Sequence, residues 1–269
     1  MSTPVRIAVF GATGRMGRAI IQAAALNPAV KLTVALDRAG NPMLGQDAGT
    51  QSGLQPNGVP VTDSLEAALN NFDVLIDFSR PEGTLAALPL CAGHGKSVVI
   101  GTTGFTPEQK AQVAAHAKKI PICMSANFSI GVNVTLRLLE LAAKTLGDAY
   151  DVEIVEAHHK HKVDAPSGTA LRMGEAVAAG LQRNLHDCAV YERHGNTGER
   201  KARTIGFATV RGGDVVGDHT VMFLGDGERV EISHKASSRM NFSNGAVRAA
   251  AWLSGRGAGL YEMKDVLNL

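Results

Sequence analysis

Five short apolar runs alternate with helical patterns through the first half of the chain, and this alternation restricts the fold more than any other feature. The runs are four to seven residues long and rich in valine, isoleucine and leucine, as strands buried on both faces should be. The runs lie at residues 5–10, 30–36, 73–78, 97–101 and 121–124, and the helical patterns cover about 14–26, 64–70, 83–93 and 107–118. This β-α-β-α order predicts a Rossmann-like, doubly wound parallel sheet.

The pattern changes near residue 130, where we expect a second unit to begin. The helices expected there cover residues 131–146, 169–183 and 244–253, and the strands cover 152–156, 203–210, 214–224 and 228–235. Gly225-Asp226-Gly227 is a strong hairpin signal between the last two strands. The second unit is therefore expected to be an α+β domain with an open, mixed and largely antiparallel sheet.

Composition and charge exclude several classes of protein. Of the 269 residues, 45% are hydrophobic and 19% are charged, which excludes disorder as the main state. The 27 basic and 25 acidic residues leave a net charge of +2, so we expect no nucleic-acid partner. No apolar run reaches the ~18 residues of a membrane span and no secretory signal is recognisable, so we expect a cytoplasmic protein without membrane contact. The three widely spaced cysteines favour neither a disulfide framework nor a zinc site.

Three glycines follow the first strand directly. Gly11, Gly14 and Gly17 form a G-x-x-G-x-x-G pattern at the point where the first helix begins. Glycine lets the backbone turn sharply and approach a pyrophosphate, while the helix N-terminus offers free N–H donors. The pattern therefore predicts a dinucleotide site, and the alternative is a purely structural turn.

An acidic and a basic residue, Asp37 and Arg38, end the second strand. Asp37 lies 20 residues after Gly17, where an acid normally bonds the adenosine ribose hydroxyls. Arg38 is suited to pair with a 2′-phosphate or to stack on adenine. Because an acid selects NAD and a base accepts NADP, the sequence leaves open NADH, NADPH or both as the cofactor.

Two further loops follow strands of the predicted parallel sheet, Gly101-Thr102-Thr103-Gly104 and Ser125-Ala126-Asn127-Phe128. Ligands of open α/β sheets bind beyond the carboxyl ends of the strands, so both loops are placed to line a nicotinamide pocket. Each loop read alone is as well explained as a turn.

The most unusual stretch is His158-His159-Lys160-His161-Lys162, between a predicted strand and a predicted helix. Ser167 is expected to cap that helix, and Gly168 and Thr169 place backbone N–H groups at its start. Cationic side chains beside a helix N-terminus predict an anion site for a carboxylate-bearing substrate, and histidine and lysine can also supply a proton. A solvated basic loop and a metal site are the alternatives; we expect no metal, because the flanking lysines repel a cation.

The other histidines and Arg239 receive no catalytic role. The histidines at 94, 116, 186, 194, 219 and 234 are isolated in the sequence and are expected on the surface or in the core. Arg239 is as well suited to support the site as to form a structural ion pair.

Several stretches, taken in order, resemble the 4-hydroxy-tetrahydrodipicolinate reductase family, historically called dihydrodipicolinate reductase. They are GATGRMGR, DFSRPEGT, GTTGF, SANFSIGVNV, EAHHKHKVDAPSGTAL and HKASSRMNFSNGAVRAA. The resemblance runs over essentially the whole chain, and the segment that begins EAHHKHK is its most specific part. It implies an oxidoreductase of the diaminopimelate route to lysine. Such an enzyme delivers hydride from NADH or NADPH to C4 of a cyclic dicarboxylate, 4-hydroxy-tetrahydrodipicolinate, and forms 2,3,4,5-tetrahydrodipicolinate.

The resemblance also implies roles for individual residues. His158 is similar to the family's proposed proton donor or acceptor, and Lys162 to its partner proton donor. The implied substrate contacts are His159, Ser167, Gly168 and Thr169. The implied cofactor contacts are Gly11, Ala12, Thr13, Gly14, Arg15, Met16, Asp37, Arg38, Gly101, Thr102, Thr103, Ser125, Ala126, Asn127 and Phe128. Members often have glutamate where Asp37 stands, so the preference between NADH and NADPH stays open.

The same resemblance implies two domains and a homotetramer assembled through the second one. We place the dinucleotide-binding domain at residues 1–128 and the substrate-binding and oligomerisation domain at residues 129–240, with a C-terminal helix at about 241–269 packing back on the first. Two alternatives remain: another NAD(P)-dependent oxidoreductase of a small carboxylate, and a non-catalytic dinucleotide sensor. An alcohol dehydrogenase would need a Tyr-x-x-x-Lys pair or an equivalent, and none of the tyrosines has a lysine four residues on.

Overall fold

The computed structural model describes residues 3–238 and 240–269, which divide into two units. Unit 1 comprises residues 3–130 together with 240–269, and unit 2 comprises residues 131–238. Arg239, for which the sequence left two roles open, lies outside the described residues.

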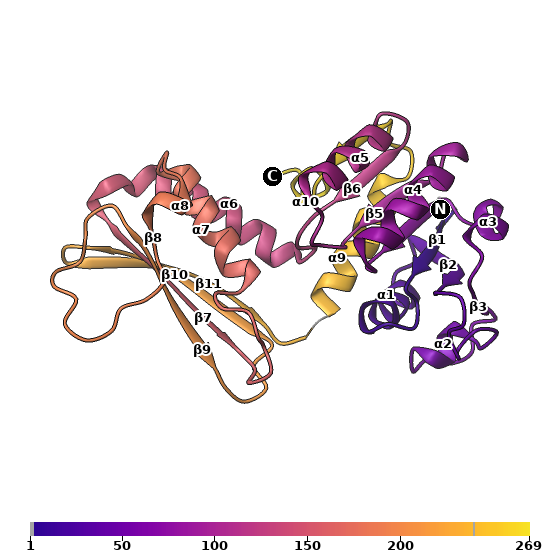
Figure 1. Ribbon diagram of the computed structural model, residues 1–269, viewed down its shortest axis with the longest axis horizontal. Coiled ribbons are helices and arrows are strands. Elements are labelled where there is room, and N and C mark those ends of the chain that lie inside the picture. Colours follow the sequence, from indigo (N-terminus) through magenta and orange to yellow (C-terminus); the bar gives the residue numbers. More distant parts are fainter. Residues whose placement is uncertain (1–2, 239) are drawn as a thin grey trace. The chain divides into compact units, whose positions relative to one another are not determined.

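Unit 1 is built on a parallel sheet of seven strands, in the order β12-β6-β5-β4-β1-β2-β3 (Figure 1). The strands are β1 (Val5–Phe10), β2 (Val30–Leu36), β3 (Val61–Thr62), β4 (Val74–Asp77), β5 (Ser97–Ile100), β6 (Pro121–Met124) and β12 (Gly259–Tyr261). The five apolar runs of the sequence all form strands in this sheet, and the doubly wound fold is confirmed. The edge strands β3 and β12 were not predicted, because two or three residues carry no recognisable period.

Helices cover both faces of this sheet. They are α1 (Arg15–Ala25), α2 (Ala48–Gln51), α3 (Leu65–Ala68), α4 (Pro81–Gly93), α5 (Pro107–Ala117), α9 (Met240–Leu253) and α10 (Met263–Leu267), with a 3-10 turn at Leu69–Asn71. Ile7 and Val9 pack with α1, α9 and α10 on one face, whereas Ala8 packs with α3, α4 and α5 on the other. A strand that is buried on both faces in this way must be apolar throughout, which is the pattern seen in the sequence.

The helix expected at about 241–269 ends at Leu253 as α9, and β12 and α10 follow it. Helix α9 belongs to the core of unit 1. Ala246, Val247 and Ala250 of this helix are fully buried against the sheet. A Cβ on Gly245 would lie 1.7 Å from the carbonyl oxygen of Phe128, so only glycine lets the helix approach the loop after β6 this closely.

Unit 2 carries a mixed sheet of five strands, in the order β11-β10-β7-β9-β8 (Figure 1). Its strands are β7 (Asp151–His158), β8 (Ala189–Val190), β9 (Ile205–Arg211), β10 (Gly217–Gly225) and β11 (Glu228–Ala236), and its helices are α6 (Ile130–Leu146), α7 (Gly168–Gly180) and α8 (Leu185–Cys188), with a 3-10 turn at Gly147–Ala149. The hairpin between β10 and β11 is confirmed, with Gly225 paired to Glu228. The expectation of a largely antiparallel sheet holds only for β7, β10 and β11, because β9 pairs in parallel with both β7 and β8. Parallel pairing of β7 and β9 needs a crossover, and α7 lies within that connection.

Helices α6 and α7 cover one face of the unit 2 sheet. Leu139 of α6 and Met173 of α7 pack against Val152, Ile154 and Val221 in a separate hydrophobic core. Alternate residues of β7 face this core, starting with Val152 and Ile154. The same alternation places the polar residues Glu156 and His158 on the core-facing side, at the C-terminal end of the strand. Within residues 3–238 and 240–269, none of the helices has the length and apolar character needed to cross a membrane.

Candidate active site

The glycine loop of unit 1 is shaped by close backbone contacts between β1 and α1. Gly11 has a φ of +73°, which L side chains rarely adopt. A Cβ on Gly17 would lie 2.1 Å from the carbonyl oxygen of Gly11, so this crossing requires glycine. Gly14 occupies the N-cap of α1, no side chain caps the helix there, and its first turn holds no acidic residue. The loop therefore leaves the positive end of α1 to a ligand, and a pyrophosphate fits such a cradle.

Asp37 ties the second strand to this loop. Its Oδ2 accepts hydrogen bonds from the backbone N–H and the hydroxyl of Thr13, at 2.9 and 2.7 Å, and its Oδ1 accepts one from the N–H of Arg38 at 2.8 Å. Burial opposes the ionisation of this carboxyl group, but the hydrogen bonds outweigh burial and lower the pKa of Asp37. An ionised acceptor thus stands at the edge of the glycine loop, with the exposed Arg38 beside it.

Asp77, to which the sequence analysis gave no role, organises the loops that follow β4 and β5. The residue is fully buried, and burial raises the pKa of its carboxyl group. Its Oδ1 accepts hydrogen bonds from the N–H of Ser79 at 2.8 Å and from the Thr102 hydroxyl at 3.4 Å, and its other oxygen accepts one from Thr84. A Cβ on Gly101 would lie 2.2 Å from the Phe78 ring, so the second loop also passes close to the first.

The loop after β6 joins the same edge of the sheet. The N–H of Ser125 donates to the carbonyl oxygen of Ile100 at 3.2 Å, and its hydroxyl donates to that of Asn127 at 3.0 Å. The buried Phe128 ring packs against Phe78, with the ring centroids 5.4 Å apart. A Cβ on Gly11 would lie 3.8 Å from the Cβ of Ser79, which links the glycine loop to this group. The structure therefore gathers the predicted cofactor residues of all four segments along the carboxyl edge of one sheet.

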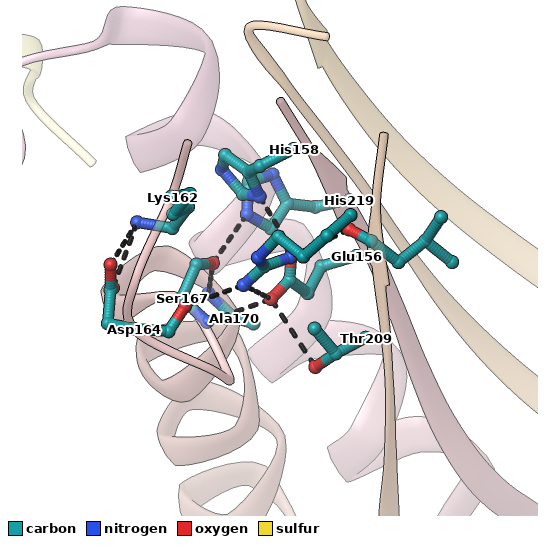
Figure 2. A network of polar contacts seen from close by, with 10 residues as sticks. Glu156, His158, Lys162, Asp164, Ser167, Ala170, Thr209 and His219 are labelled. Atoms are coloured by element: carbon teal, nitrogen blue, oxygen red, sulfur yellow. Dashed lines mark hydrogen bonds and ion pairs between the residues drawn. The ribbon is translucent and has the colours of Figure 1, made fainter. Parts of the chain in front are cut away.

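In unit 2, the core-facing side of β7 ends in Glu156 and His158. Both side chains are buried, with 1% and 8% of the residue surface exposed. The Nδ1 atom of His158 lies 2.6 Å from Oε2 of Glu156 (Figure 2). Residues two apart in a strand point to the same face, which is why the pair meets.

Arg211 completes the pair from the neighbouring strand. The parallel register of β7 and β9 places it opposite His158. Its guanidinium group donates to both carboxylate oxygens of Glu156, at 2.8 Å each, and to the carbonyl oxygen of Asp164 at 2.6 Å. Burial disfavours the ionised form of Glu156, but the hydrogen bonds from Arg211, from His158 and from the N–H of Ser167 outweigh it and lower the pKa of this carboxyl group. Glu156 is therefore an ionised, buried carboxylate.

Ser167 joins the start of α7 to a second buried histidine. As N-cap, its Oγ accepts a hydrogen bond from the N–H of Ala170 at 3.1 Å, and the same atom lies 2.9 Å from Nε2 of His219. The His219 ring meets the His158 ring edge-on, with 5.0 Å between centroids. Burial, reinforced by the nearby His158, lowers the pKa of His219 to about 4. His219 is thus neutral at physiological pH.

Lys162 lies on the loop between β7 and α7, beside Asp164 (Figure 2). Its Nζ donates to both oxygens of that carboxylate, at 2.8 and 2.9 Å. His159 stays on the same loop, where its N–H donates to the carbonyl oxygen of Val215 at 2.7 Å and its ring lies near that of His161. Gly168 is exposed at the start of α7, with open space where a Cβ would stand, and Thr169 follows it. The predicted substrate residues therefore lie at the end of β7, on the β7–α7 loop and at the start of α7, and His158 and Lys162 bond to different carboxylates.

Three members of this network were missed from sequence. Glu156 carried a usable signal, because a glutamate two residues before a histidine in a strand shares its face. Arg211 and His219 carried none, because only the strand register brings them to His158. His219 lies in the core, as the sequence analysis allowed, but it also contacts Ser167 and His158 of this network. Among the described residues, no three His, Cys, Asp or Glu side chains are grouped so as to hold a metal ion.

Comparison with known proteins gives matches along the chain. Residues 5–128 match the family model "Dihydrodipicolinate reductase, N-terminus", and residues 131–267 match "Dihydrodipicolinate reductase, C-terminus". A dipicolinate-bound dihydrodipicolinate reductase from Paenisporosarcina sp. TG-14 is 27% identical, with 96% of this chain and 97% of that chain covered and a TM-score of 0.75.

Two more distant structures share the fold alone. An amine dehydrogenase from Mycobacterium smegmatis is 15% identical, with 95% of this chain and 94% of that chain covered and a TM-score of 0.59. A probable dehydrogenase from Thermotoga maritima is 10% identical, with 97% of this chain and 92% of that chain covered and a TM-score of 0.61.

Proposed function

Because the chain belongs to the dihydrodipicolinate reductase family, we propose that unit 1 binds the dinucleotide and unit 2 binds the dicarboxylate substrate. The chain is an NAD(P)H-dependent oxidoreductase of the diaminopimelate route to lysine. The proposed reaction converts 4-hydroxy-tetrahydrodipicolinate to 2,3,4,5-tetrahydrodipicolinate. The observation that carries the assignment of unit 2 is the buried Glu156–His158 pair beside the N-terminus of α7.

The substrate has two carboxylates, and unit 2 offers cationic and N–H donors in one place. We assign one carboxylate to the start of α7, at Ser167, Gly168 and Thr169, where backbone N–H groups and the helix dipole favour an anion. Lys162 and His159, on the loop that leads from β7 into α7, are assigned to the substrate as well. Dipicolinate, the ligand of the Paenisporosarcina relative, should bind here too.

The proposed cofactor, NADH or NADPH, supplies the hydride when it is bound. The pyrophosphate is assigned to Gly11, Ala12, Thr13, Gly14, Arg15 and Met16, the adenosine ribose to Asp37 and Arg38, and the nicotinamide to Gly101, Thr102, Thr103, Ser125, Ala126, Asn127 and Phe128. The uncapped N-terminus of α1 and the close crossing at Gly17 support the first of these assignments.

Replacing a hydroxyl group by hydride releases water, and the reaction consumes a proton. We assign the role of proton donor to His158 and Lys162. The ring of His158 is held by an ionised carboxylate, and Lys162 lies on the loop that leads to the proposed carboxylate site. A proton donor at this place can neutralise the negative charge that develops on the reduced substrate.

A coupled assay tests the proposed reaction. Fresh product of the synthase reaction between pyruvate and aspartate semialdehyde is mixed with the protein, and oxidation of NADH and of NADPH is followed separately. We expect oxidation that depends on the synthase. Tight nucleotide binding without oxidation would instead favour another carboxylate substrate or a sensing role.

Gly17→Ala should damage the cofactor site and the fold together. A Cβ at this position meets three backbone atoms, Gly11 O at 2.1 Å, Ala12 Cα at 2.7 Å and Ala12 C at 2.8 Å, so the loop must move. We expect the free energy of unfolding to fall by about 1–3 kcal/mol, the usual cost of overpacking. NADH affinity should fall at least about 10-fold, because a displaced loop no longer directs its N–H groups at the phosphates.

Urea unfolding and NADH fluorescence titration measure the two effects. The matched control is Gly93→Ala at the end of α4, where a Cβ meets no atom within 4 Å. That variant should retain both stability and NADH affinity. If Gly17→Ala matched Gly93→Ala in NADH affinity, the loop would not be the phosphate site.

Arg38→Ala should weaken NADPH more than NADH. A charged contact to the 2′-phosphate contributes about 1.5–3 kcal/mol, so the affinity for NADPH should fall by about 10–100-fold. NADH lacks this phosphate and should lose only stacking on adenine. Lys31→Ala, an exposed cation at the other end of β2, is the control for net charge. Equal losses for the two nucleotides would mean that Arg38 only stacks on adenine.

We further propose a cytoplasmic homotetramer assembled through the unit 2 sheet. The face of this sheet opposite α6 and α7 carries the apolar side chains of Val155, Val210 and Met222, of which Val210 is 52% exposed. Light scattering after size-exclusion chromatography should give the mass of a tetramer. A monomer at micromolar concentration would contradict the assembly.

A further inference from the structure

Glu156 bonds to groups on several elements of unit 2, and the roles proposed above give it no part of its own in the reaction. It lies on the core-facing side of β7, with 1% of its surface exposed. A buried carboxylate is costly unless it is paired and hydrogen-bonded. Its partners come from several elements: His158 on β7, Arg211 on β9 and Ser167 at the start of α7. The carboxylate therefore connects the proposed proton donor to the proposed carboxylate site.

The hydrogen bond to Glu156 determines which nitrogen of His158 faces the site. An ionised carboxylate only accepts hydrogen bonds, so the Nδ1 atom, 2.6 Å from Oε2, must carry a proton. The other ring nitrogen, Nε2, is then left for proton transfer. A Cβ on Gly217 would lie 3.0 Å from this Nε2 atom, so glycine in the first position of β10 keeps a side chain off it.

The same carboxylate fixes the position of His158 relative to α7. Oε1 of Glu156 accepts the backbone N–H of Ser167 at 3.0 Å, and Arg211 bridges Glu156 to the carbonyl oxygen of Asp164. Movement of Glu156 would therefore disturb the histidine and the helix start together. A residue that served only to neutralise Arg211 would need neither of these further bonds.

The charged and titratable groups around His158 come from several elements of unit 2. Glu156 lies on the same strand, Arg211 on β9, the neutral His219 on β10 and Lys162 on the loop after β7. Two of these neighbours are cations and one is an anion. Glu156 is the one group of this set that stabilises positive charge on the imidazole.

We propose that Glu156 is a positioning residue for the reduction: it holds His158 with Nδ1 protonated and directs Nε2 to the substrate. This inference rests on the proposed role of His158. It adds that the histidine acts as half of a carboxylate–histidine pair, anchored by Arg211.

Glu156→Gln tests the proposal, because it keeps the shape of the side chain and removes its charge. We expect kcat to fall by about 10–100-fold, the range for partners that orient a functional histidine. NADH affinity should be unchanged, since the cofactor residues lie in unit 1. Unchanged kcat would overturn the proposal.

Glu153→Gln is a matched control on the same strand. Glu153 is a carboxylate bound by Arg193 and Arg200, but it lies on the opposite face of β7 and does not face His158. Its replacement should leave kcat as it is. A similar loss of kcat in both variants would mean that Glu156→Gln acts by disturbing the sheet and not through His158.

A double variant separates this inference from the proposed function. In a His158→Gln background, Glu156→Gln should cause little further loss of kcat, because its effect acts through the histidine. Additive losses would overturn the positioning role. Full turnover in His158→Gln alone would instead refute the proposed role of His158.

Imidazole ¹⁵N NMR of the unmutated protein gives a test that does not depend on a folded variant. At a pH where His158 is neutral, its Nδ1 should carry the proton and its Nε2 should not. The opposite tautomer would contradict the proposal.

Discussion

His158→Gln should lower kcat by about 10²–10⁴-fold, the range for loss of a general acid. Glutamine retains a polar side chain at the end of β7 but cannot donate a proton to the reduced substrate. NADH affinity should stay within about twofold, because the glycine loop and Asp37 belong to unit 1 and His158 belongs to unit 2. We therefore expect kcat to fall while NADH still binds with nearly unchanged affinity.

The experiment compares kcat from the coupled assay with NADH affinity from fluorescence titration. His161→Gln is the control: it removes an exposed imidazole from the same histidine–lysine stretch, three residues further on. That variant should retain kcat. Normal turnover in His158→Gln would move the proton donor elsewhere, and loss of NADH binding would point to misfolding rather than to chemistry.

The parallel sheet of unit 1 could be predicted from sequence because its strands are buried on both faces. Such strands are continuous apolar runs, and β1 shows the reason: Ile7 and Val9 pack on one face while Ala8 packs on the other. The start of α5 could also be predicted, since Thr106 is a typical N-cap residue and Pro107 follows it at the first helical position. The structure adds a capping box between Thr106 and Gln109. Residues close together in the sequence determine both features, so a short stretch of sequence is enough to predict them.

The sheet of unit 2 was predicted less well, because the direction of a strand is not a local property. The apolar alternation in Ile205–Arg211 is the same whether β9 runs parallel or antiparallel to β7. Its direction follows from the crossover through α7, which depends on the packing of Met173 and Val177 over the sheet. A sequence pattern records the face that a strand buries, but not the neighbour that it pairs with.

The same distinction explains what was missed in the candidate site. The glycine loop and the histidine–lysine stretch are contiguous in sequence, so both could be found. Arg211 and His219 lie about 50 and 60 residues from His158 along the chain and meet it only through strand register. Asp77 resembled the end of an ordinary strand, although it holds two loops of unit 1 in place.

Lys162→Ala should lower kcat/KM by about 10²–10⁴-fold, because the substrate loses a cation and a proton donor at once. A further effect adds to this loss. Nζ of Lys162 now donates to both oxygens of Asp164, and the alanine variant would leave that carboxylate unpaired. An unpaired carboxylate repels a dicarboxylate substrate, so KM should rise as kcat falls.

Two companion variants separate the charge from the proton. Lys162→Ala with Asp164→Asn removes the unpaired carboxylate, so dipicolinate affinity should partly recover while kcat stays low. Lys162→Arg keeps a cation beside Asp164 but gives up its proton far less readily, so it should bind dipicolinate well and still turn over slowly. If Lys162→Arg restored kcat fully, Lys162 would act by charge alone, and His158 would remain as the sole proton donor. If none of these variants changed kcat, the proposed carboxylate site at the start of α7 would be wrong.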